Sequence, residues 1–267
     1  MSKKHILLIH GTWCNGGNWG AFATEMERRG FTVHAPSSLY HAPPASADIW
    51  GNAQKVAKVG LLDYVAELVE LVRTMDSPPI VVGHSMGALL AQLVAARCST
   101  RGLVLLGPAP TAGMFSLYPS AVRLWGRYLP QWILGKPMYP VAYGPWKKLI
   151  CNALPEEISA DYYASLCAES GTAYREMVLW FLDPKKSSRM DYAAVTVPVL
   201  VIAGSEDKCT PPGMCRATAR RYRQLATYVE LKGSDHMMTV GPFLPSTLAA
   251  MDGWMAQHDL LPDARPR

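Results

Sequence analysis

Long apolar runs, closely spaced cysteines and charged residues are all scarce in this sequence. The longest wholly apolar runs, such as residues 6–9 and 199–203, are far shorter than the roughly 20 residues that cross a bilayer. The four apolar residues of the first run are also too few for the core of a secretory signal. We therefore expect no stable membrane insertion, and a cytoplasmic location is the default expectation.

The six cysteines include no C-x-x-C pair and no spacing with histidine that is typical of a metal site. In a reducing compartment such cysteines remain free thiols. The sequence therefore predicts no metal ion, and nothing in it indicates a cofactor.

Charged residues make up 18% of the chain, with 26 Lys and Arg against 21 Asp and Glu. The basic residues come singly or in pairs such as Lys147-Lys148 and Lys185-Lys186, which is unlike the clustered charge of a nucleic-acid-binding protein. With 49% hydrophobic residues, the composition also excludes disorder over most of the chain. The 267 residues fit one globular domain with room for an insertion.

Short β-rich runs alternate with helical patterns along much of the chain, which predicts an α/β fold. We expect a mostly parallel sheet of about six strands with helices on both faces. Residues 36–60 are expected to be irregular because they include three prolines. The expected strands are residues 5–9, 31–35, 80–82, 103–106, 197–203 and 227–231.

The alternation fails between residues 107 and 191. This stretch holds 13 of the 25 aromatic residues in about a third of the chain. Bulky side chains fit either the internal core of a small helical insertion or the roof of an apolar pocket. We therefore predict an α/β core formed by residues 1–107 and 192–267, with residues 108–191 inserted as a helical cap or lid.

The stretch Gly83-His84-Ser85-Met86-Gly87 matches the G-x-S-x-G pattern of a nucleophile elbow. It follows an expected strand and precedes an apolar, alanine-rich helix, which is the context that this turn needs. The serine holds a strained backbone conformation, and both glycines must lack a side chain so that strand and helix can approach each other. We predict that Ser85 is a catalytic nucleophile; the alternative is a tight turn with an idle serine.

A serine hydroxyl needs a positioned base, and the base needs an acceptor that fixes its tautomer. His236 follows the last expected strand, in a loop that can reach back over the sheet edge, and is the predicted base. His10 is expected to shape the loop after the first strand, and the side chain of His84 is expected to point away from the substrate. The other histidines have no supporting context: His5, His34, His41 and His258.

The predicted acid is Asp207, which comes directly after the strand ending at residue 203. This position gives the chain order Ser, Asp, His. Glu206 and Asp235 are rivals, but the side chains of sequence neighbours such as Asp235 and His236 rarely face each other. The two rivals are then expected in loop or turn hydrogen bonds.

Acyl transfer also needs hydrogen-bond donors for the oxyanion. One comes from the residue after the nucleophile and one from the loop after the first strand. These would be the backbone N–H groups of Met86 and Thr12, and Gly11 leaves room for a substrate carbonyl.

Together these residues resemble the α/β-hydrolase superfamily, and the resemblance covers the whole chain. Three stretches resemble the plant methylesterase and hydroxynitrile lyase branch more specifically: residues 10–17 (HGTWCNGG), 206–208 (EDK) and 235–237 (DHM). The resemblance implies an α/β-hydrolase fold. Within these stretches, Trp13 and Met237 are expected to lie beside the substrate.

That branch holds two chemistries. Resemblance to the lyases would place a threonine where Gly11 stands and a lysine where Met237 stands. Their absence favours hydrolysis through an acyl-enzyme. Thr12 offers a hydroxyl one position further along the chain, so the lyase remains an alternative.

We therefore expect a serine carboxylesterase that cleaves small to medium hydrophobic esters without a cofactor. Its partner would be a small-molecule ester, and a homodimer is left open. Two alternatives remain: a lyase or cofactor-free oxidative enzyme on the same scaffold, and a ligand receptor without catalytic activity.

Overall fold

The structure is a computed structural model that describes residues 4–41 and 49–262. Its centre is a six-stranded sheet with the strand order β2-β1-β3-β4-β7-β8, in which every neighbouring pair is parallel. The strands are β1 (His5–Ile9), β2 (Thr32–His34), β3 (Ile80–His84), β4 (Gly102–Leu106), β7 (Val199–Gly204) and β8 (Ala226–Leu231).

The central strands are continuous apolar runs because both faces of the sheet are covered. Alternate residues of β1 enter two different cores. Leu7 and Ile9 pack into one core, whereas Ile6 and Leu8 pack into the other. The first core is built with helices α3 (Leu61–Arg73), α4 (Met86–Ala95) and α10 (Pro212–Arg221), and the second with α1 (Gly20–Arg28) and α11 (Leu244–Gln257).

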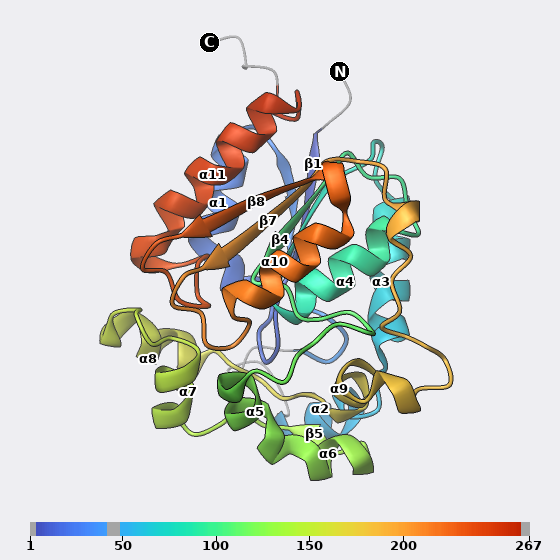
Figure 1. Ribbon diagram of the computed structural model, residues 1–267, viewed down its shortest axis with the longest axis vertical. Coiled ribbons are helices and arrows are strands. Elements are labelled where there is room, and N and C mark those ends of the chain that lie inside the picture. The colour runs from blue at the N-terminus through green and yellow to red at the C-terminus, as the bar shows by residue number, and fades with distance from the viewer. Residues whose placement is uncertain (1–3, 42–48, 263–267) are drawn as a thin grey trace.

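The segment between β4 and β7 forms most of the lower part of the molecule in Figure 1. We call residues 108–191 the cap segment. It contains five α-helices among its described elements and a small antiparallel sheet. These elements are α5 (Pro119–Trp125), α6 (Leu129–Leu134), α7 (Tyr143–Leu149), α8 (Glu156–Ala164), α9 (Gly171–Val178), β5 (Pro137–Met138) and β6 (Glu169–Ser170).

Buried polar contacts join the cap segment to the α/β core. The Glu169 carboxylate, which is fully buried, accepts a hydrogen bond from the Tyr64 hydroxyl at 3.0 Å and lies 3.2 Å from His41 Nε2. The indole Nε1 of Trp13 donates to the carbonyl of Met138 at 3.0 Å. Because buried polar groups are costly when unpaired, these contacts fix the position of the cap segment over the core.

The predicted α/β class and its six strands are confirmed. The expectation that residues 36–60 are irregular is wrong in part, because a further helix, α2 (Ile49–Val56), lies there. This helix packs against β5 and β6, so its partners come from the distant cap segment. Pro43 and Pro44, on which the expectation partly depended, lie outside the described residues. Over the described ranges, no helix has both the length and the apolar character that crossing a bilayer requires.

Candidate active site

Ser85 occupies a sharp turn between β3 and α4. Its φ is 57° and its ψ is −121°, a conformation that L residues rarely adopt. Backbone hydrogen bonds hold the turn: Ser85 N–H donates to Leu106 at 2.9 Å, and the Ser85 carbonyl accepts from Ala109 N–H at 3.1 Å. The surrounding chain therefore fixes the strained residue and presents its side chain at the carboxyl end of the sheet.

The two glycines of the elbow are required by close backbone approaches. A Cβ at Gly83 would overlap the backbone of Gly87 and Ala88, and a Cβ at Gly87 would overlap the carbonyls of Ile9 and His10. Backbone cannot move aside as a flexible side chain can. Strand and helix therefore pack closely enough to form the turn only with glycine at both positions.

His236 and Asp207 are directly hydrogen-bonded. The distance from His236 Nδ1 to Asp207 Oδ2 is 2.8 Å, and both side chains are almost wholly buried. Asp207 Oδ1 also accepts the backbone N–H groups of Cys209 and Thr210, each at 2.8 Å. The carboxylate is thus held in one orientation, so His236 carries its proton on Nδ1 and Nε2 is the acceptor nitrogen of the neutral ring.

Burial alone would lower the pKa of His236 because it penalises the charged ring. The carboxylate of Asp207 opposes this effect, the side chain of Cys209 adds to the opposition, and the pKa of His236 is raised well above its ordinary value. The ring is therefore a stronger proton acceptor than an isolated buried histidine would be.

Sequence reasoning missed two neighbours of this pair. The Thr210 hydroxyl lies 2.9 Å from Asp207 Oδ2, 3.0 Å from the Gly107 carbonyl and 3.2 Å from His236 Nδ1. Gly107 has a φ of 50°, and a Cβ there would come within 3.3 Å of Thr210, His236 and Asp207. The strand-end glycine after β4 thus lets the acid and base of the site approach the sheet, a role that only the tertiary contacts reveal.

Thr12 lines the smaller cavity together with Ser85, and Met86 directly follows Ser85 at the start of α4. Among the described residues, the backbone N–H group of neither residue has a hydrogen-bond partner. Met86 is the first residue of α4, where backbone N–H groups are unpaired and the helix dipole favours negative charge. A Cβ at Gly11 would meet the Cβ of Ser85 at 3.1 Å, so the loop after β1 touches the nucleophile elbow.

The sequence predicted that the His84 side chain points away from the substrate, and the structure shows that this side chain contacts the histidine loop. His84 is among the residues that line the smaller cavity with Ser85 and His236, and its ring lies 4.6 Å from the His236 ring. His84 Nε2 donates to the His236 carbonyl at 2.9 Å. The strained turn at Ser85 places this preceding side chain beneath the histidine loop, which residue order alone does not show.

The rival residues have other partners. Asp235 Oδ1 accepts from Met237 N–H at 2.9 Å, while Oδ2 accepts from Ala153 and Leu154 of the cap segment at 2.8 and 2.9 Å. Asp235 therefore ties the loop after β8 to the cap segment. The side chain of Glu206 is exposed.

His10 has the structural role that the sequence predicted. Its Nδ1 donates to the Gly11 carbonyl at 2.9 Å and its Nε2 accepts from Ser38 N–H at 3.0 Å. Burial, and then the nearby His41, lower the pKa of His10 to about 4, so the ring is neutral and braces two loops.

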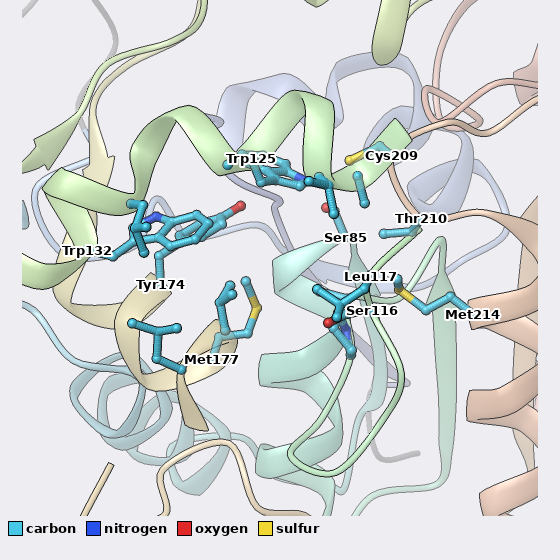
Figure 2. A pocket seen from close by; sticks show the side chains of 18 residues that line it. Ser85, Ser116, Leu117, Trp125, Trp132, Tyr174, Met177, Cys209, Thr210 and Met214 are labelled. Carbon is cyan, nitrogen blue, oxygen red and sulfur yellow. The ribbon is translucent and has the colours of Figure 1, made fainter. Parts of the chain in front are cut away.

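Two cavities meet at Ser85. The larger has a volume of about 260 Å³ and a lining that is mostly apolar, including Trp125, Trp132 and Tyr174 (Figure 2). The smaller has a volume of about 20 Å³ and includes Ser85 and His236. Both sequence-predicted substrate neighbours, Trp13 and Met237, line this smaller cavity, whereas Ser85, Trp125 and Cys209 border both cavities.

In the part of the chain that the structure describes, no group of three or more His, Cys, Asp or Glu side chains is arranged to hold a metal ion. The six cysteines are unpaired, and five of them are buried. The hydrogen-bonded pair of Asp207 and His236 near Ser85 is an arrangement suited to proton transfer and nucleophilic attack.

Comparison with known proteins agrees with this geometry. The sequence model of the "Alpha/beta hydrolase family" matches residues 6–244, and the chain therefore belongs to the α/β-hydrolase family. The superfamily resemblance seen in the sequence is thus confirmed. A pyrethroid hydrolase of Sphingobium wenxiniae is 29% identical over 87 residues, a match that spans 33% of this chain and 29% of that relative.

Solved structures share the fold over nearly the whole chain. A monoacylglycerol lipase of Paleococcus ferrophilus superposes with a TM-score of 0.70 at 18% identity and covers 97% of both chains. A methylesterase of Arabidopsis gives a TM-score of 0.70 at 15% identity, over 95% of this chain and 99% of that one. Several proteins that share this family or fold are thus ester hydrolases.

Proposed function

We propose that this protein is a serine carboxylesterase that cleaves small to medium hydrophobic esters through an acyl-enzyme. The observation that carries the proposal is the hydrogen bond between Asp207 and His236 beside the strained Ser85, where an apolar cavity meets a smaller one. An idle serine would explain neither the strain nor the buried acid–base pair, and both cost stability.

In the first half of the reaction, Ser85 Oγ attacks the ester carbonyl carbon while His236 Nε2 takes the hydroxyl proton. The carbonyl oxygen becomes an oxyanion that accepts hydrogen bonds from the backbone N–H groups of Thr12 and Met86. The C–O bond to the alcohol then breaks, and the alcohol leaves with the proton from His236. Asp207 holds the ring and stabilises its positive charge throughout.

In the second half, water attacks the acyl carbon and His236 takes one of its protons. The bond from the acyl carbon to Ser85 Oγ breaks, and the serine recovers its proton from the ring. The carboxylic acid departs, so each turnover consumes one water and needs no other reactant.

The volumes of the two cavities limit the size of the acyl and alcohol groups of the substrate. The leaving alcohol takes its proton from His236, so its oxygen must lie near the smaller cavity that His236 lines. That cavity, of about 20 Å³, holds little more than one water-sized group. The acyl group then fills the larger apolar cavity of about 260 Å³. Preferred substrates would therefore combine a bulky apolar acyl group with a very small alcohol.

The contacts of Thr12 favour hydrolysis over the lyase alternative. The Thr12 hydroxyl is already 2.6 Å from the Tyr174 hydroxyl, which makes it a poor substitute for the hydroxyl that the lyases carry one position earlier. Met237, buried beside the smaller cavity, also supplies no cation for a departing cyanide.

The first test is the intact mass of the protein after incubation with a fluorophosphonate, followed by peptide mapping. We expect one adduct on Ser85 that does not form in His236→Ala. An ester series should then show that turnover falls as the alcohol grows from methyl to butyl, while longer acyl groups are accepted. Absence of an adduct in the native protein would contradict the proposal and favour the receptor alternative.

A further inference from the structure

Large apolar side chains on the surface are concentrated around the mouth of the larger cavity. Of the 11 exposed large hydrophobic residues among those described, 10 lie between residues 115 and 182. Three of them, Leu117, Val122 and Leu129, also line the cavity. Isolated exposed apolar residues are ordinary, but such a concentration at one site marks an interaction surface.

The apolar residues come from segments that surround one opening. We call the exposed apolar side chains of residues 115–134 and 180–182 the mouth surface. Helix α6 packs on α9 through the stacked rings of Trp132 and Tyr174, whose centroids are 5.9 Å apart. Val178 and Leu179, just before residues 180–182, line the same cavity as Leu117. Figure 1 places α5, α6 and α9 at the end of the molecule opposite both termini.

The chain around the mouth surface is positively charged. Residues 77–155 contain seven Lys and Arg but no Asp or Glu. The second segment has three acids near it, and each carboxylate accepts backbone N–H groups. Asp183 accepts from Lys185 and Ser187, Glu176 from Leu61, and Asp191 from Ala193. Six exposed cations therefore accompany the mouth surface: Arg123, Arg127, Lys136, Lys185, Lys186 and Arg189.

Within the described residues, none of these six cations forms an ion pair. A second copy of the chain docked on the same surface would place six cations against six, and like charges across an interface are strongly disfavoured. Exposed apolar side chains accompanied in the same segments by cations without an ion pair instead complement a surface that is apolar inside and anionic at its boundary. An anionic lipid bilayer has these two properties.

We propose that the mouth surface docks on anionic lipid bilayers. The apolar side chains would enter the boundary between head groups and acyl chains while the cations contact the lipid phosphates. The apolar contact and the charge attraction act on the same face of the molecule. Binding of this kind is reversible and needs no helix that spans the membrane. If the proposed esterase function holds, an apolar ester dissolved in the lipid reaches the larger cavity without crossing water. The docking itself does not depend on that function.

The test is co-sedimentation of the full chain with vesicles of neutral phosphatidylcholine, or of phosphatidylcholine with about 30% phosphatidylglycerol. We expect binding only to the anionic vesicles and a strong decrease at high salt. Phe181→Ser/Ile133→Ser and Lys185→Gln/Lys186→Gln should each lower the partition coefficient about tenfold. Neither pair lines the cavity, and all four side chains are exposed, so the fold should persist.

A matched control is Arg220→Gln/Arg223→Gln. These two exposed cations lie in the last turn of α10 and just before β8, and therefore near the amino edge of the sheet. The mouth surface instead borders the cavity that includes Ser85, at the carboxyl end of the sheet. Loss of the two control cations should leave vesicle binding within about twofold, because charge acts mainly within a Debye length.

Three outcomes would overturn the proposal: no binding to anionic vesicles, equal loss of binding in the control pair, or a stable dimer in light scattering that Phe181→Ser dissolves. The last result would assign the mouth surface to a second copy. Because vesicle binding is measured without an ester, failure of the proposed hydrolysis leaves the result unaffected. Hydrolysis of a water-soluble ester, measured separately, tests the function alone.

Discussion

His84 Nε2 donates a hydrogen bond to the backbone carbonyl of His236 at 2.9 Å, and the two rings lie 4.6 Å apart. Burial, and then the neighbouring His236, lower the pKa of His84 to about 3, so the ring is neutral near pH 7. The residue before the proposed nucleophile thus holds the backbone of the proposed base. The nucleophile elbow and the histidine loop form one hydrogen-bonded unit.

His84→Phe should keep the ring packing but remove this hydrogen bond. The buried carbonyl of His236 then loses its partner, which should lower the free energy of unfolding by about 1–3 kcal/mol. We expect kcat to fall at least about tenfold with little change in KM, because His236 rather than the cavity is displaced. His84→Gln, whose amide can donate, should recover part of kcat. Equal kinetics for both variants would argue against a positioning role.

Ser85→Ala should abolish ester hydrolysis while the fold remains intact. The hydroxyl makes no hydrogen bond within the described residues, so its removal leaves no buried group unpaired. We expect kcat to fall by at least about a thousandfold and the melting temperature to stay within a few degrees. Steady-state kinetics measures the loss of activity, and circular dichroism measures the melting temperature. Retained turnover in Ser85→Ala would contradict the prediction.

The pH dependence of kcat/KM should report the raised pKa of His236. Since the neutral ring would be the base, kcat/KM should increase as pH rises. The midpoint of this increase should lie above the ordinary histidine pKa of about 6.5. Asp207→Asn removes the anion that raises the pKa. In that variant the midpoint should move to lower pH and the plateau should fall by about 100-fold or more. If the midpoint of the pH profile were the same in Asp207→Asn, Asp207 would not be the group that raises the pKa of His236.

The same pair has a consequence for stability. Because the folded protein raises the pKa of His236, the charged ring stabilises the fold below about pH 6.5, the unfolded value. This contribution is lost as pH rises through the folded pKa. Urea unfolding at several pH values, in the native protein and in Asp207→Asn, measures the contribution. If the native protein and Asp207→Asn showed the same pH dependence of the free energy of unfolding, Asp207 would not be the source of this contribution.

Gly87→Ala and Gly253→Ala should have opposite effects. A Cβ at Gly87 would overlap the carbonyls of Ile9 and His10, whereas a Cβ at Gly253 in α11 meets nothing within 4 Å. We expect Gly87→Ala to cost several kcal/mol and to prevent fluorophosphonate labelling. Gly253→Ala should stabilise the fold by about 0.5–1 kcal/mol, because alanine favours helix interiors. Thermal unfolding of both variants decides the comparison.

Asp235→Ala should loosen the cap segment. The carboxylate accepts three backbone N–H groups, two of them from Ala153 and Leu154. Leaving such donors unpaired should lower the free energy of unfolding by about 2–4 kcal/mol and speed proteolysis within residues 108–191. Glu206→Ala removes an exposed acid close by in the fold and should change stability by less than about 0.5 kcal/mol. Equal effects would contradict the tethering role of Asp235.

Residue pattern alone predicted the six strands, the elbow at Ser85 and the pairing of Asp207 with His236. The strands and the elbow are local features: a buried strand is a continuous apolar run, and an elbow needs its two glycines. The pairing of Asp207 with His236, which lie 29 residues apart, followed from the expected chain order Ser, Asp, His. Helix α2 was missed because it packs on β5 and β6, more than 80 residues further along the chain. Thr210, Gly107 and His84 were missed as site neighbours for the same reason.

The sequence by itself thus determined where the six strands lie along the chain and the chemical groups of the site, since both follow from short-range periodicity and motif spacing. Only the tertiary structure decided how these groups are surrounded. The size of the two cavities, the raised pKa of His236 and the free cations around an apolar mouth depend on which distant side chains are close in space. Burial and Coulomb interactions act across space rather than along the chain, so no local pattern encodes them.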